Sequence, residues 1–342
     1  MRFIHLADCH LASENIFEAE VSDFIRKKSR ESFENILKAN KDADFALLAG
    51  DLFERSFFTS TDYKRLFDLI DDFAKNIYYV TGNHDYISYD NQMFFMDKPH
   101  NLKIFPSDKL SFFEEGKTRI YGISYEDRIF SKDFPYQEKL DSNYFNILLV
   151  HGVVGDSESN YLKLDLEKLN KMGFDYVGLG HIHKPISVTD NIIYSGTTEA
   201  KNFSEDLSYG YIAYDENVPE RRYVSRNKFT ILSLKTSDFN DIGEFTDHIR
   251  SLLDNKINFL RLKIINDSKL DLDEQRLKND LGVFYLKIEE EKYQDLENLK
   301  LIYKDSLLSR FLSESEKTYQ DDKILQRAKE LGIDAILRSK YD

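Results

Sequence analysis

Short apolar runs alternate with charged, periodic stretches over the first hundred residues. Three apolar runs predict buried strands, at 3–7, 44–49 and 77–81. Between them, two periodic charged stretches predict helices at about 21–39 and 61–75, the second capped by Ser60 or Thr61. This alternation of strands and helices predicts a layered α/β domain.

The pattern becomes richer in strands from about residue 119. Five segments read as extended, at 119–123, 145–150, 176–179, 186–194 and 209–214, and one helix is expected at about 164–172. Two sheets packed face to face, with helices outside, would fit this pattern. The expected fold class is therefore α/β, a four-layer α-β-β-α sandwich.

Glycine becomes scarce after about residue 228, since 11 of the 14 glycines lie at or before Gly210. The later part reads as strand, helix, strand, helix, strand, over 229–234, 241–253, 259–265, 271–279 and 283–288. Two helical stretches follow, at about 305–316 and 321–331. We predict a first domain over 1–227, a small α+β domain over 228–300, and C-terminal helices over 301–342. An apolar face of these helices either binds a partner or packs against the small domain, and it consists of Ile302, Tyr303, Leu307, Leu308, Phe311 and Leu312.

Composition narrows the class of protein. The chain has 342 residues, 41% of them hydrophobic and 14% aromatic, which excludes a largely disordered chain. The lone Cys9 cannot form an internal disulfide, and strand-like residues begin at Arg2, so we expect no leader and a cytoplasmic location. No apolar run approaches the ~18 residues of a membrane span, and no membrane partner is expected.

The charge balance bears on nucleic acid as a partner. The formal net charge is −14, which taken alone argues against a nucleic-acid binder, because such proteins normally carry a basic face. One basic cluster stands near the proposed domain junction and consists of Arg221, Arg222, Arg226 and Lys228. It is either a contact to a phosphate backbone or a solvated strand edge, and the sequence favours neither.

Polar clusters follow five of the expected strands, and four of these clusters contain glycine. They are DCH at 8–10, GDLFER at 50–55, GNHD at 82–85, HG at 151–152 and GHIHKP at 180–185. The loops after the carboxyl ends of strands are where α/β sheets build their sites. Glycine at such a place allows a sharp turn that brings the neighbouring side chain inward.

The clusters contain seven oxygen and nitrogen donors: Asp8, His10, Asp51, Asn83, His151, His181 and His183. This donor set suits Mn(II), Fe(II) or Zn(II). Seven donors exceed one tetrahedral site and suit two metals ~3.5–4 Å apart, the arrangement used to hydrolyse phosphate esters. Each cluster alone could be structural, as a turn or a satisfied histidine. Their joint occurrence after successive strands favours a metal site.

This ordered set of motifs resembles the calcineurin-like metallophosphoesterase superfamily over its first half, from Asp8 to His183. Within it, the chain most resembles the SbcD-type DNA double-strand-break repair nucleases. Three features carry that resemblance: Phe53 in GDLF, the segment IIYSGTTEAKNFSED at 192–206, and a C-terminal extension of over 100 residues that resembles their capping domain.

The resemblance implies roles for the site residues. Asp8, His10, Asp51 and His183 would hold one metal, and Asp51, Asn83, His151 and His181 would hold the other. His84 would protonate the leaving oxygen, and Asp85 would orient His84. Position 54 departs from the family, because it is Glu where Asp or His is usual.

The same resemblance implies a function and partners. It implies a DNA exonuclease and endonuclease with two divalent metals, Mn(II) being expected, that acts with an SbcC-like coiled-coil ATPase of the SMC family. A homodimer through the phosphoesterase domain is also an expectation. The alternatives are a phosphoesterase acting on a cyclic nucleotide, a nucleotide or a phosphoprotein, and a non-enzymatic scaffold. Two dications would bring positive charge to the cleft, so −14 is a weak guide against DNA.

Overall fold

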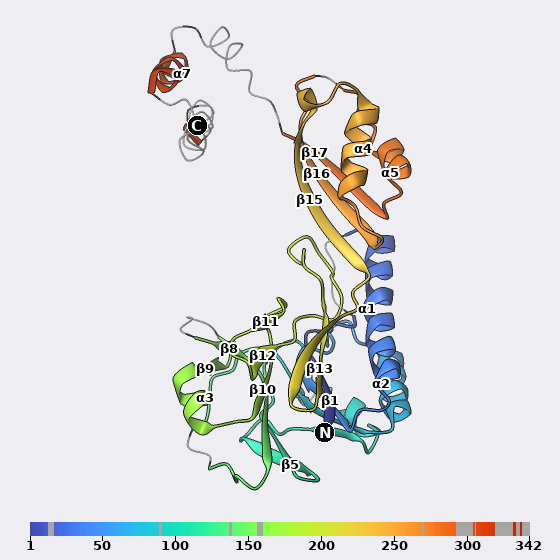
Figure 1. Cartoon of the computed structure of the whole chain (residues 1–342), viewed down its shortest axis with the longest axis vertical. Helices are drawn as coiled ribbons and strands as arrows, with labels where there is room; N and C mark the ends of the chain where they lie inside the picture. Colours follow the sequence, from blue (N-terminus) through green and yellow to red (C-terminus); the bar gives the residue numbers. More distant parts are fainter. Residues whose placement is uncertain are drawn as a thin grey trace. The chain divides into compact units, whose positions relative to one another are not determined.

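The structure is a computed structural model (Figure 1). It describes residues 1–12, 17–88, 91–136, 139–155, 160–268, 270–291, 304, 306–318, 331–332 and 336. The chain divides into two compact units. The first contains 1–232, 249–261 and 274–287, and the second contains 233–248, 262–273 and 288–342.

One six-stranded sheet of the first unit has the order β14-β13-β1-β2-β3-β4. Its strands are β1 (Arg2–Leu6), β2 (Phe45–Ala49), β3 (Asn76–Val80), β4 (Leu102–Ile104), β13 (Gly210–Asp215) and β14 (Val218–Tyr223). The strands β1 to β4 run parallel, and β13 pairs antiparallel with β1. The carboxyl ends of β1, β2 and β3 therefore meet at one edge of this sheet.

The second six-stranded sheet has the order β11-β12-β10-β7-β6-β5. Its strands are β5 (Ser111–Glu115), β6 (Thr118–Gly122), β7 (Phe145–His151), β10 (Tyr176–Gly180), β11 (Ile186–Ser187) and β12 (Ile192–Tyr194). The central strands β6, β7, β10 and β12 are parallel. The single strand expected over 186–194 is wrong, because the chain turns back between β11 and β12, which pair antiparallel.

Helices pack against these sheets through the apolar faces that the sequence pattern predicts. The helices of this unit up to residue 172 are α1 (Ala19–Ala39), α2 (Ser60–Phe73) and α3 (Leu166–Met172), with the short 3-10 helix η1 (Gln92–Phe95). One buried cluster joins α1 and α2 to the first sheet, and another joins α3 to the second. A third cluster, which includes Phe3, Leu47 and Leu149, contains residues of both sheets. The mixed α/β class is thus confirmed.

The start of α2 differs from the expectation. Thr59, and not Ser60 or Thr61, is the N-cap residue, and it forms a capping box with Asp62. The Thr59 hydroxyl accepts from the Asp62 amide, and the Asp62 carboxylate accepts from the Thr59 amide. These two bonds satisfy amides that the first helical turn leaves without partners, which is why the helix begins one residue earlier.

The C-terminal part alternates strands and helices as the sequence predicts. A three-stranded sheet of this part has the order β15-β16-β17. Earlier in the chain, a two-stranded sheet pairs β8 (Val153–Val154) with β9 (Lys163–Leu164). The remaining elements are β15 (Asn227–Lys235), η2 (Thr236–Asp238), α4 (Ile242–Leu252), β16 (Ile257–Ile265), α5 (Glu274–Leu281), β17 (Tyr285–Glu291) and α7 (Leu307–Thr318). The domain boundaries at 227 and 300 stay predictions.

The helix expected at 305–316 is present as α7, and most of the helix expected at 321–331 lies outside the described residues. On α7, Leu308 and Leu312 are fully buried, whereas Leu307 is 68% exposed. Packing within the chain therefore accounts for much of the apolar face. No helix among the described residues is long and apolar enough to cross a bilayer.

Candidate metal centre

All five polar clusters lie at carboxyl ends of parallel strands. The loops after β1, β2 and β3 carry Asp8, His10, Asp51 and Asn83, and the ends of β7 and β10 carry the three histidines 151, 181 and 183. Asp8, Asp51 and His151 are almost completely buried. Parallel strand order thus brings side chains up to 175 positions apart in sequence to one place.

Four of the seven candidate donors have a left-handed backbone conformation that non-glycine residues rarely adopt. The φ angles are 52° for Asp8, 45° for His10, 52° for Asp51 and 92° for His181. Such strain costs of order 1–3 kcal/mol per residue and concentrates at functional sites. The surrounding structure must therefore hold these residues in place.

Glycine makes the close approach of the two sheets possible at this site. A Cβ at Gly180 would lie 1.8 Å from the carbonyl oxygen of Ala49, so no other residue fits there without moving the backbone. Gly50 has a φ of 83° and contacts the His151 ring, where a Cβ would again collide. Both positions are among the glycines that the sequence places beside candidate ligands.

One group of donors gathers around Asp8. Asp8, His10 and His183 each offer one ligand atom, and these atoms lie within 4.8 Å of one another. Nε2 of His10 and Nε2 of His183 are 3.1 Å apart. The His181 amide donates to both carboxylate oxygens of Asp8 at 3.1 Å, which orients this carboxylate.

A second group gathers around Asp51 and His151. Nε2 of His151 lies 3.2 Å from Oδ2 of Asp51 and 3.0 Å from Oδ1 of Asn83. Nδ1 of His151 donates to the carbonyl of Ala49 at 2.9 Å. In the neutral ring, Nε2 would then direct a lone pair at oxygen atoms, which is unfavourable unless a cation lies between them.

The pKa values of His151 and Asp51 agree with a site for a cation. Burial disfavours the charged form of His151, but the Asp51 carboxylate outweighs it and raises the pKa of His151 to about 9. Burial also opposes ionisation of Asp51, yet the surrounding histidines hold the pKa of Asp51 well below its usual range. A divalent metal would supply the positive charge that a proton supplies here, so these residues fit a metal.

His181 lies beside this group but contributes differently. Its ring centroid lies 5.2 Å from that of His151 and 4.1 Å from that of Tyr161. Burial, together with the neighbouring His151, lowers the pKa of His181 to about 4, so its ring is neutral near pH 7. A neutral imidazole is the form that binds metals.

Glu205 supports His183 and was not assigned a role from the sequence. Its carboxylate accepts a hydrogen bond from Nδ1 of His183 at 2.6 Å, and it is 3% exposed. A bond at Nδ1 fixes the tautomer that leaves the Nε2 lone pair free for a metal. Glu205 lies in the segment 192–206 that carries the family resemblance. An acidic residue in that segment is the sequence feature that could have indicated a partner for a histidine ligand.

Lys201, from the same segment, is a second residue that the sequence did not assign. Its ammonium group is buried and donates to the carbonyl oxygens of Asp8 at 3.3 Å and Glu199 at 3.1 Å, and to the hydroxyl of Thr197. Thr197 also donates to the Asp8 carbonyl at 2.7 Å. Together they hold the strained backbone of Asp8.

His84 pairs with Glu54 and not with Asp85. Nδ1 of His84 donates to the Glu54 carboxylate, and this hydrogen bond raises the pKa of His84. Asp85 accepts instead from the amides of Leu52 at 2.5 Å and Gly82 at 2.6 Å, and from the Tyr79 hydroxyl. The expectation that Asp85 orients the His84 ring is therefore wrong, because the ring bonds to Glu54. The Asp85 carboxylate instead holds the backbone of the loops that contain Leu52 and Gly82.

The predicted DNA-binding cations differ in their partners. Arg221 donates to the carbonyls of Ser195 and Tyr194, whereas Arg222, the next residue on β14, pairs with Glu220. Lys228 donates to the carbonyl of Asp206, and Arg226 is exposed. That these residues contact DNA stays a prediction.

Comparison with known proteins places this site in a family. The chain is similar to a protein named "Uncharacterized metallophosphoesterase YhaO" of Bacillus subtilis (strain 168), with 32% identity over 232 residues. The match covers 62% of this chain and 56% of that protein, so the chain spans little more than half the length of this relative. The calcineurin-like phosphoesterase family model matches residues 1–185, more than half of the chain and every candidate ligand. The chain belongs to the calcineurin-like phosphoesterase family.

Proposed function

We propose that this chain is a metal-dependent nuclease of the SbcD type that hydrolyses phosphodiester bonds of DNA. The observation that carries the proposal is the convergence of Asp8, His10 and His183 with Asp51 and His151, beside the Glu54–His84 pair. Such a donor set beside a histidine supports hydrolysis of a phosphate ester.

The seven donors would hold two divalent metals, with Asp51 shared between them, and Mn(II) is the metal we propose. When bound, divalent metals supply Lewis-acid catalysis and an attacking water at neutral pH. Glu205 would keep His183 in the tautomer that binds metal, and the Ala49 carbonyl would do the same for His151.

The chain itself supplies the proton for the leaving group. The Glu54 carboxylate holds the proton on Nδ1 of His84, which leaves Nε2 to face a substrate, and the His84 side chain is 39% exposed. In the proposed step, water forms the new bond to phosphorus and gives up one proton to solvent. The doubly protonated His84 ring, which the Glu54 hydrogen bond favours by raising the pKa of His84, gives its Nε2 proton to the departing sugar oxygen as the old P–O bond breaks.

A cation at the edge of this site fits an anionic substrate. Nη2 of Arg128 lies 4.0 Å from the Glu54 carboxylate, and the Arg128 side chain is 64% exposed. An exposed guanidinium can contact phosphate without first leaving a buried environment. Arg128 thus supports a phosphate-containing substrate near His84.

The choice of DNA rests on the resemblance of the segment 192–206 and on the C-terminal extension. The segment contains Lys201 and Glu205, both of which contact candidate metal ligands, and this supports its importance for the site. The proposal also includes two kinds of partner, an SMC-type ATPase and a second copy of this chain, and a location in the cytoplasm at the nucleoid. For the fold, we propose a four-layer sandwich with a C-terminal cap. The three buried clusters of the first unit support the layered arrangement.

The test compares substrates. The purified chain is incubated with Mn(II) and either linear DNA or the small diester bis(4-nitrophenyl) phosphate, with and without a candidate ATPase and ATP. We expect Mn(II)-dependent degradation of linear DNA. Hydrolysis of the small ester or of nucleotides alone would contradict DNA as substrate, and no hydrolysis of either would contradict the enzyme assignment.

A further inference from the structure

A charged hollow lies between α1 and α2, outside the metal site. It has a volume of about 400 Å³ and is lined by Asp23, Arg26, Lys27, Arg30, Glu31 and Arg65. Four of these residues are cations and two are acids. An excess of two positive charges is notable in a chain whose net charge is −14, because negative charge predominates elsewhere.

The acids of the hollow are already engaged by cations on the same helix. Asp23 pairs with Arg26, and Glu31 pairs with Lys28 at 2.7 Å and lies 3.9 Å from Lys27. The positive charge of Arg65 is therefore not neutralised by them. Among the described residues, no hydrogen bond or ion pair involves the Arg65 side chain, which is exposed.

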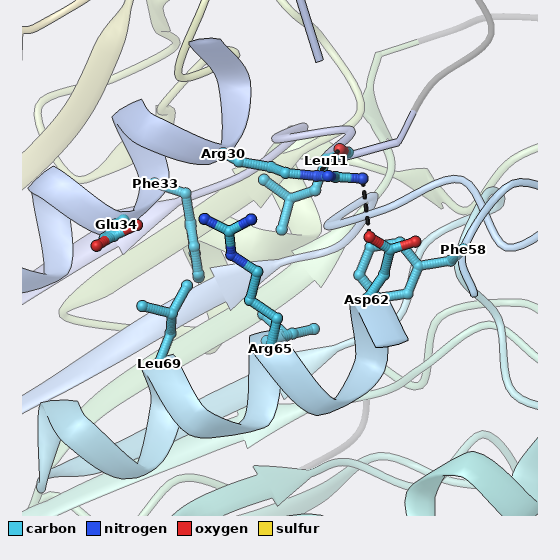
Figure 2. Close-up of a pocket in the computed structure, with 9 residues that line it drawn as sticks. Leu11, Arg30, Phe33, Glu34, Phe58, Asp62, Arg65 and Leu69 are labelled. Carbon is cyan, nitrogen blue, oxygen red and sulfur yellow. Dashed lines mark hydrogen bonds and ion pairs between the residues drawn. The ribbon is translucent and has the colours of Figure 1, made fainter. Parts of the chain in front are cut away.

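Arg30 faces the same hollow and is held in place from the α2 side. Its Nη2 pairs with Asp62 at 2.8 Å, and its Nε donates to the carbonyl of Leu11 at 3.2 Å. Figure 2 shows the Arg65 side chain extending from α2 toward Arg30, whose guanidinium is directed to Asp62. Asp62 offsets the charge of Arg30, so Arg65 is the cation of the hollow without an ion-pair partner among the described residues, and an anion bound beside it would be favourable.

This hollow adjoins the loop that carries a candidate ligand. Leu11, whose carbonyl fixes Arg30, follows directly after His10 and lines the small adjoining cavity shown in Figure 2. Arg30 is therefore linked to the loop that carries His10 by a hydrogen bond. The small adjoining cavity measures only about 20 Å³, so it is too small for a nucleobase. The larger charged hollow has room for a phosphate.

We propose that the α1–α2 hollow binds a backbone phosphate of DNA, with Arg65 as a direct contact and Arg30 as a second, pre-positioned one. The proposal rests on the proposed function for its polyanion, since a guanidinium pair matches phosphate oxygens. An acidic peptide could offer the same charge without phosphate, and the experiment separates the two.

The test measures DNA binding by the full chain in EDTA, so that no DNA is cut. Fluorescein-labelled duplex is titrated at several salt concentrations with the unaltered protein and with Arg65→Gln, Arg65→Lys and the control Lys64→Gln. Lys64 is exposed on the same helix, and its replacement changes the net charge equally. We expect Arg65→Gln to weaken binding several-fold and to reduce the slope of log affinity against log salt by ~0.9, one phosphate contact. Arg65→Lys should retain most of that slope, and Lys64→Gln should match the unaltered protein.

Four outcomes would overturn the inference. The first three are equal binding by Arg65→Gln and the unaltered protein, equal losses in Arg65→Gln and Lys64→Gln, and absence of DNA binding by the unaltered protein. A polyglutamate peptide that competes at the same charge concentration as DNA would also overturn it, in favour of a protein ligand. Failure of the proposed function is distinct, because a chain that binds DNA through Arg65 without Mn(II)-dependent cleavage would sustain this inference alone.

Discussion

The carboxylate of Glu54 accepts the Nδ1 proton of His84, so the histidine nearest in sequence to the candidate ligand Asn83 is oriented by a residue of a different loop. Asp85, its neighbour in the sequence, binds backbone amides instead. The loop after β2 thus supplies both a candidate ligand, Asp51, and the partner of the proposed acid. This relationship leads to the first prediction.

Glu54→Gln should lower kcat by roughly 10–100-fold with little change in metal content, because a neutral amide no longer stabilises the protonated His84 ring that donates to the leaving oxygen. His84→Ala should lose more, ~10²–10⁴-fold, since the proton donor itself is gone. Metal content by mass spectrometry and kcat on the small diester check both. Loss of metal from either variant would contradict the roles given to this pair.

Glu205→Gln should weaken metal affinity by roughly 10–100-fold, because His183 loses the partner that fixes its Nδ1 proton. Asp206→Asn is the matched control, as this neighbouring acid is exposed. Isothermal titration with Mn(II) measures both variants. Equal affinities for the two would show that Glu205 does not act through His183.

Lys201→Met should lower the free energy of unfolding by about 3 kcal/mol, because buried oxygen acceptors lose a charged donor. The carbonyl of the strained Asp8 would then also lose one of its two side-chain donors. Lys38→Met, at a lysine that is 60% exposed, should change stability by less than about 0.5 kcal/mol. Urea denaturation in EDTA compares them, and similar stabilities for the two variants would refute the role of Lys201.

The stability of the chain should depend on pH through His5, which lies away from the metal donors and bonds to the Tyr176 hydroxyl at 2.9 Å. Burial, aided by Arg221, lowers the pKa of His5 from 6.5 to about 3. The unfolded chain therefore binds a proton more readily. The stability that His5 contributes is complete above pH 6.5 and is lost as the pH falls from 6.5 toward 3, at up to ~1.4 kcal/mol per pH unit.

His5→Gln removes this titration, so its free energy of unfolding should fall less steeply with acidification than that of the unaltered protein. Urea denaturation of both proteins at about pH 7.5 and about pH 5 gives, for each, the slope of the free energy of unfolding against pH. The difference between the two slopes cancels the contributions of other groups. Identical slopes would mean that His5 is not held neutral by the fold.

The sequence predicts the strands, the loops and the donors, because strand periodicity and the polar residues after each strand are local signals. It does not predict the partners of those donors. Glu54 and His84 are 30 positions apart, and His183 and Glu205 are 22 apart, so each pair depends on how strands and loops meet. Lys201 would be expected at the surface from its charge alone, and only the fold explains its burial.

The proposed role of Asp51 in a divalent-metal site that cuts DNA is tested by Mn(II) stoichiometry and linear-DNA cleavage on the same samples of unaltered protein and Asp51→Ala. We expect the unaltered protein to bind two equivalents of Mn(II) and to cleave DNA. We expect the variant to lose both tight binding at the two positions and cleavage. An Asp51→Ala protein that binds two equivalents and cleaves DNA at the unaltered rate would contradict it.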